Sequence, residues 1–159
     1  MNKTNFDEDC IHGDPWTVLP VKTRKFAKDC TEIVLSYRKI NKLINFENFE
    51  NLEALWLNNN KLETVDGLEQ NFRIKILSFG GNRIQSIQNS CLINMKFLKI
   101  LFLNNNKLRN LDNNILFLKN FSFLENLNLF GNPLSEEPEY RPRIVYSLPS
   151  LDIFDRHSK

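Results

Sequence analysis

The 159-residue chain is poor in the residue types that build most catalytic and metal sites. Its two histidines, His12 and His157, stand in opposite terminal segments, so a histidine triad or metal cluster has little to work with. Its three cysteines, Cys10, Cys30 and Cys91, form neither an even set nor a C-x-x-C pair. We therefore expect reduced thiols, no enzyme activity, no metal and no cofactor.

Long apolar runs and charge of one sign are also absent. No apolar stretch reaches the roughly 18 residues of a membrane-spanning helix. Residues 1–14 are polar and acidic without an apolar core, so we expect no signal peptide and a cytoplasmic protein. The formal charge is +2, and no block of about five like charges occurs. We expect no direct nucleic-acid partner and no membrane partner.

Glycine is scarce as well, with five residues in the whole chain. The pair Gly80-Gly81 lacks the G-x-x-x-x-G-K pattern of a phosphate-binding loop. In the repeat described next, the pair follows a predicted strand. We expect it to form a flexible loop that leaves the surface open there.

The dominant positive feature is an internal repeat. Residues 54–62 read ALWLNNNKL and residues 100–108 read ILFLNNNKL, which are identical at seven of nine positions. The shared pattern is L-x-x-L-x-L-x-x-N-x-L, whose alternation around each paired leucine predicts a short strand with one buried face. Because one unit cannot bury its own leucines, successive units must stack into a solenoid.

The asparagine of each unit stands where the chain must turn, and its side chain can pair with backbone groups that the turn leaves free. We predict a structural ladder at Asn60, Asn82, Asn106 and Asn132. Arg38 stands at the equivalent position of a degenerate first unit. Counted from Arg38, the spacings are 22, 22, 24 and 26 residues, within the range of about 20–29 for this repeat class. The spacing predicts about five coils.

These units divide the chain into three parts. We predict an N-terminal extension or flap over residues 1–29, repeats over 30–134, and a C-terminal cap over 135–159. In the flap, Trp16 and Phe26 are the large apolar anchors, and an extended arm that binds a partner is the alternative. The short coils predict 3₁₀ turns opposite the strands, whereas residues 113–123 have room for a helix. A second helix is expected to begin near residues 138–141 and to end before Pro149.

The repeats and the ending Tyr-Arg…Leu-Pro-x-Leu-x-x-Phe-Asp together resemble a known family. The body resembles the short leucine-rich-repeat family that includes the regulatory subunit of protein phosphatase 1. The ending resembles the cap of that subunit, of the A-prime subunit of the spliceosomal U2 particle, and of small ciliary and flagellar proteins. The resemblance implies an α/β leucine-rich-repeat solenoid with a parallel, concave sheet.

Side chains that alternate with the buried leucines must point out of that concave face. The apolar ones predict a patch for a protein partner, because exposed aromatic anchors are typical of interfaces. This predicted partner-binding set consists of Val34, Trp56, Ile76, Ile100, Phe102 and Phe130. The alternative is that the N-terminal flap folds over the patch and hides it.

We therefore expect a non-enzymatic protein–protein interaction module that binds one or more proteins through its concave face. We also consider a second contact through the N-terminal arm. The resemblance to small ciliary proteins favours a subunit of a large assembly such as the ciliary or flagellar axoneme. The alternatives are a nuclear ribonucleoprotein subunit of the U2 A-prime type and a phosphatase regulator.

Overall fold

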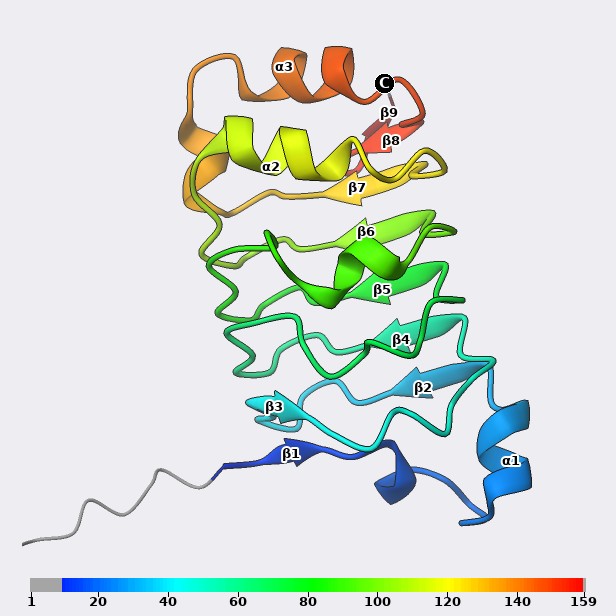
Figure 1. Cartoon of the computed structure of the whole chain (residues 1–159). Helices are drawn as coiled ribbons and strands as arrows, with labels where there is room; N and C mark the ends of the chain where they lie inside the picture. The colour runs from blue at the N-terminus through cyan, green and yellow to red at the C-terminus, as the bar shows by residue number, and fades with distance from the viewer. Residues whose placement is uncertain (1–9, 159) are drawn as a thin grey trace, which may run out of the picture.

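The paired leucines of each repeat lie on or beside a short strand, and the strands stack side by side. The computed structural model describes residues 10–158, and within them one sheet has the strand order β2-β4-β5-β6-β7-β8-β9 (Figure 1). Its strands are β2 (Glu32–Val34), β4 (Ala54–Trp56), β5 (Ile76–Ser78), β6 (Ile100–Phe102), β7 (Asn126–Asn128), β8 (Ile153–Phe154) and β9 (His157–Ser158). All neighbours pair in parallel except β8 and β9. The predicted α/β solenoid with a parallel sheet is confirmed.

The register places one leucine of each unit in a buried column. Ile33 pairs with Leu55, Leu55 with Leu77, Leu77 with Leu101 and Leu101 with Leu127. The four leucines are fully buried. A buried leucine contributes roughly 1.5–3 kcal/mol through removal of its surface from water. Stacking is therefore what stabilises each coil.

The segments opposite the strands are short, as the coil length predicts. They include the 3₁₀ turns η2 (Cys91–Asn94) and η3 (Pro133–Glu136) and the helix α2 (Leu111–Leu118). The helix begins two residues earlier than predicted because the Asn110 side chain accepts the Asn113 N–H and caps it. It also ends earlier, and Phe121 then returns to the core.

The C-terminal segment covers the last coil. Helix α3 (Tyr140–Ser147) ends before Pro149, as predicted, and buries Ile144. Arg141 then donates hydrogen bonds to the carbonyls of Phe154 and Ser158, tying α3 to the β8–β9 hairpin. The sequence did not predict that hairpin.

The described part of the N-terminal segment packs at the opposite end of the stack (Figure 1). It contains β1 (His12–Gly13), η1 (Pro15–Thr17) and α1 (Arg24–Asp29), and β1 pairs in parallel with β3 (Lys42–Leu43). The Trp16 ring lies edge-on to Phe49 at 5.4 Å between centroids. Phe26 is 37% exposed, and Ala27 is instead the buried residue of α1. Phe26 is therefore a weaker anchor than the sequence suggested.

The glycine pair after β5 forms a packed turn. Gly81 has a φ of +71°, which favours glycine, and a Cβ there would lie close to the Asn59 side-chain oxygen. Gly80 is buried beside Asn104 and donates its N–H to the Asn58 side chain. The expectation of an open, flexible loop is wrong, because asparagines of the neighbouring coils fill the space.

Among residues 10–158, no helix has the length and apolar character needed to cross a membrane.

Candidate protein-binding face

Two columns of side chains flank the buried leucine column on the concave face. The register pairs Trp56 with Ser78 and Ser78 with Phe102, so Trp56 and Phe102 occupy one column, two strands apart. In the other column Ile76 lies beside Ile100. Strands in a sheet are about 4.8 Å apart, so one partner element can contact both aromatic rings.

The two aromatic residues border a shallow groove. Trp56 is held in place because its Nε1–H donates to Glu32 Oε1 at 2.8 Å. Between the rings, Ser78 is buried and hydrogen-bonded to Asn58 Oδ1. The groove has a volume of about 340 Å³. It is lined by Trp56, Asn58, Ser78, Phe102, Asn104, Asn126, Asn128, Ile153 and Arg156.

The other predicted partner-binding residues lie around this groove. Ile76 and Ile100 are half-buried, whereas Val34 on the edge strand β2 is 55% exposed and Phe130 beyond β7 is 65% exposed. Asparagines and Arg156 line much of the groove itself. The face therefore combines two aromatic anchors with several hydrogen-bonding groups, and sequence reasoning missed the contribution of Ile153 and Arg156 from the cap.

The charges beside the apolar columns neutralise one another in pairs. Lys75 Nζ lies 2.8 Å from Glu53 Oε1, and Lys99 Nζ lies 2.9 Å from Glu125 Oε1. The two residues of each pair lie at equivalent positions of neighbouring coils. The Lys75 N–H donates to the Glu53 carbonyl, and the Glu125 N–H donates to the Lys99 carbonyl. Exposed pairs of this kind contribute little to stability. They leave the concave face without a strong field of one sign.

The asparagine column lies inside the turn that follows the strands. Asn106 accepts the Ile84 N–H at 2.9 Å and donates to the carbonyls of Phe79 and Leu103. The structure gives Asn60, Asn82 and Asn132 the same kind of contacts, joining each coil to the one before it. All four side chains are buried.

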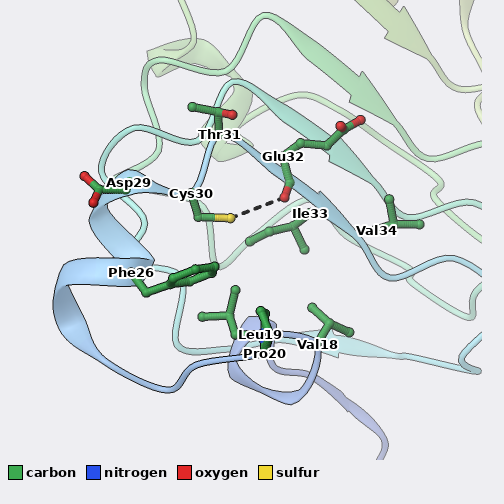
Figure 2. A pocket seen from close by; sticks show the side chains of 10 residues that line it. All are labelled: Val18, Leu19, Pro20, Phe26, Asp29, Cys30, Thr31, Glu32, Ile33 and Val34. Atoms are coloured by element: carbon green, nitrogen blue, oxygen red, sulfur yellow. Dashed lines mark hydrogen bonds between the residues drawn. The ribbon is translucent and has the colours of Figure 1, made fainter.

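A second cavity, not anticipated from the sequence, lies between α1 and the open edge of β2 (Figure 2). It has a volume of about 520 Å³ and is lined by apolar side chains that include Leu19, Phe26 and Val34. The Cys30 thiol donates to the Glu32 carbonyl, and burial raises the pKa of Cys30. Val34 belongs both to this cavity and to the predicted partner-binding set, so the two surfaces meet at β2.

The described residues offer little for catalysis. No group of three His, Cys, Asp or Glu side chains among residues 10–158 is placed to hold a metal ion. Cys91 is buried, its thiol donates to the Val65 carbonyl, and burial raises its pKa to about 12. Such a thiol is inert near neutral pH.

These observations agree with the comparison to protein families. The model of the family described as "Leucine-rich repeat" matches residues 62–158, more than half of the chain. The chain therefore belongs to the leucine-rich-repeat family, whose members typically bind other proteins.

Of the similar proteins, one has a nuclear name and another is part of a protein complex. The acidic leucine-rich nuclear phosphoprotein 32-related protein of Plasmodium falciparum is 28% identical over 80% of this chain, which spans 48% of that relative's length. The Drosophila melanogaster SNF/U2A′ complex contains a chain that is 29% identical with a TM-score of 0.71, matched over 80% of this chain and 73% of that one. An internalin of Listeria monocytogenes, 21% identical with a TM-score of 0.60, covers 83% of this chain and 49% of that one, and shows the fold alone.

Proposed function

We propose that the chain is a non-enzymatic protein–protein interaction module whose concave face binds one folded partner protein. The observation that carries this proposal is the pair of aromatic anchors, Trp56 and Phe102, set in one column around a groove. Aromatic residues dominate the binding energy of interfaces when a partner removes them from water. Both rings are half-buried, and neither belongs to the hydrophobic core or to the partly buried apolar side chains that pack against it, so core packing does not explain their position.

The polar groups of the groove favour a partner with both apolar and hydrogen-bonding side chains. Arg156 lies toward the C-terminal end of the sheet, and Glu32 lies on β2 at the other end. A partner element with an acidic group near Arg156 and a basic group near Glu32 would therefore bind in one orientation, because complementary charge fixes register.

The assembly that we propose is a nuclear one, of the U2A′ type. The SNF/U2A′ complex supports it, because that relative is part of a complex with a protein, and the phosphoprotein relative has a nuclear name. The axonemal assembly that the sequence favoured has no support from these comparisons. The phosphatase-regulator alternative has none either.

Photo-crosslinking in the source cells tests the binding face. We would place benzoylphenylalanine at position 102, on the concave face, and in a matched control at Leu116, which is 70% exposed on α2. The proposal predicts one dominant crosslinked protein from position 102 that is absent from position 116. The same crosslinks from both positions, or none from position 102, would contradict it.

A separate experiment tests the nuclear assignment. The purified chain would be titrated with the SNF-type protein of the same organism and, as a control, with an unrelated protein of similar size and charge. Selective binding that Trp56→Ala weakens is the expected result. If position 102 crosslinks to a different protein and the SNF-type protein does not bind, the nuclear assignment fails while the interaction role stands.

A further inference from the structure

A stripe of four cationic side chains runs along the solenoid at the turn after the asparagine ladder. We call Lys39, Lys61, Arg83 and Lys107 the basic stripe. Each of the last three directly follows a ladder asparagine. Their backbone N–H groups donate to Ile40, Leu62 and Ile84, one coil back in each case. The stripe therefore places one cation on each of four successive coils, all of them exposed.

The stripe is not neutralised by ion pairs among the described residues. Within residues 10–158, none of its four side chains forms an ion pair or a side-chain hydrogen bond. Lys75 and Lys99, by contrast, are matched by glutamates on neighbouring coils. Like charges on adjacent coils repel one another. The fold therefore keeps these cations side by side without a stabilising contact of their own.

Three members of the stripe line a groove with a volume of about 1040 Å³. Lys42 adds a further cation to its wall, and the Glu63 and Asp66 carboxylates lie in the same groove. The side chains of Glu63 and Asp66 form no hydrogen bond or ion pair within residues 10–158. The groove thus presents four cations and two free acceptors to one ligand.

We propose that this groove binds an extended acidic peptide segment of a partner protein. Carboxylates at alternate positions of such a segment would pair with Lys39, Lys61 and Arg83, and alternate residues of an extended chain are about 6.8 Å apart. Long lysine and arginine side chains can span the difference from the strand spacing of about 4.8 Å. The backbone N–H groups of the segment would donate hydrogen bonds to the carboxylates of Glu63 and Asp66.

The two carboxylates in the groove, Glu63 and Asp66, favour a peptide over a nucleic acid as the ligand. A phosphodiester backbone has no N–H donor to offer Glu63 and Asp66, and the two carboxylates would repel its phosphates. The lining residues also include no aromatic ring on which a base could stack. The basic stripe lies beyond the ladder from the concave face, so the inference is independent of the proposed function.

Fluorescence anisotropy with the full chain tests the inference. The probe would be a labelled peptide of alternating Glu and Ser, about eight residues long, with the matching Gln-Ser peptide as its control. At an ionic strength of about 50 mM, where screening is weak, the Glu-Ser peptide should bind and the Gln-Ser peptide should not.

Charge reversal then locates the site. Lys61→Glu/Arg83→Glu should weaken binding by about tenfold or more, which corresponds to about 1.4 kcal/mol. Lys25→Glu/Lys96→Glu changes the net charge equally at exposed sites outside the groove and should change affinity less than about twofold. Melting curves check folding, and Lys61→Gln/Arg83→Gln replaces the first variant if it unfolds.

Four outcomes would overturn the proposal. The first is that the Glu-Ser peptide does not bind. The second is that both double variants lose the same affinity, which would show an effect of net charge alone. A third is tighter binding of an oligothymidylate of equal charge that Lys61→Glu/Arg83→Glu abolishes. The last is peptide binding only after deletion of residues 2–9, which would assign the groove to the chain's own acidic residues Asp7, Glu8 and Asp9.

Discussion

At the residue scale, the ladder asparagines use both ends of one amide to join two coils. Each amide oxygen accepts a backbone N–H, and each amide nitrogen donates to two backbone carbonyls. Leucine would fill the same volume but leave those buried backbone groups unpaired. A buried group without its partner costs about 1–3 kcal/mol.

Asn106→Ala should therefore lower the free energy of unfolding by about 1–3 kcal/mol. Chemical denaturation measures this, with Asn94→Ala as the matched control, because Asn94 is exposed and no described side-chain hydrogen bond involves it. Asn110 is unsuitable as a control because it caps α2. Equal losses in the two variants would show that the ladder contacts contribute no special stability.

The Cys91 thiol gives a pH-dependent prediction. Its pKa rises from 9.0 to about 12 in the fold because of burial. The unfolded state therefore loses the proton first, and the contribution of Cys91 to stability is lost as pH rises from 9.0 toward about 12. Cys91→Ala should show a shallower fall in unfolding free energy than the wild type over that range. Parallel pH curves for the two proteins would contradict the burial of the thiol.

At the element scale, the C-terminal cap closes the hydrogen-bonding edge of the last coil. Asp155 accepts the N–H groups of Leu129 and Phe130 and the Tyr140 hydroxyl. Burial, and then the Asp155 carboxylate, raise the pKa of Tyr140. The Tyr-Arg and Phe-Asp parts of the ending therefore act together, with Arg141 positioned over the Phe154 ring at 5.6 Å.

Asp155→Ala should destabilise the fold more than Tyr140→Phe does. The first change leaves the Leu129 N–H without an acceptor, at about 1–3 kcal/mol, and also removes the acceptor of the Tyr140 hydroxyl, whereas the Phe130 N–H keeps Asn128 Oδ1. The second change removes one hydrogen bond, worth about 1 kcal/mol. Thermal melts of both variants measure the order, with Asp152→Ala as an exposed control. A larger loss in Tyr140→Phe would contradict this account of the cap.

Removal of residues 135–159 should expose the apolar face of the last coil. A solenoid needs a covered end, and this segment supplies Ile144, Leu148, Leu151 and Phe154 to the core. We expect aggregation or loss of the cooperative transition, measured by light scattering and calorimetry. A soluble truncated chain with an unchanged melting transition would show that the cap is dispensable.

The elements differ in how far the sequence predicted them. The strands and the ladder could be predicted from the sequence, because each unit repeats the same residues at nearly the same spacing. The cavity lined by Leu19 and Phe26 could not be predicted from the sequence, because residues 10–29 contain no repeat that indicates how they pack. The groove beside Trp56 was predicted as an apolar patch, but asparagines and Ser78 of the repeats also line it, and Arg156 joins them from the cap. Such contacts between distant segments leave no local pattern.

At the scale of the whole molecule, the solenoid separates its surfaces. The concave face carries the aromatic anchors, the turns after the ladder carry the basic stripe, and the two terminal segments cover the two ends of the stack (Figure 1). Because the leucine column and the ladder supply the stability, side chains on either surface can vary with little effect on folding. This separation is what makes the binding proposal testable without unfolding the protein.

The most direct test of the central claim is the dissociation constant for the protein that crosslinks to position 102. We predict that Trp56→Ala and Phe102→Ala each weaken binding by about 2 kcal/mol or more, roughly thirtyfold. Melting temperatures should change little, and the matched variant Leu116→Ala should bind like the wild type. Unchanged affinity in both aromatic variants would contradict the account, and so would a loss of affinity that only accompanies unfolding.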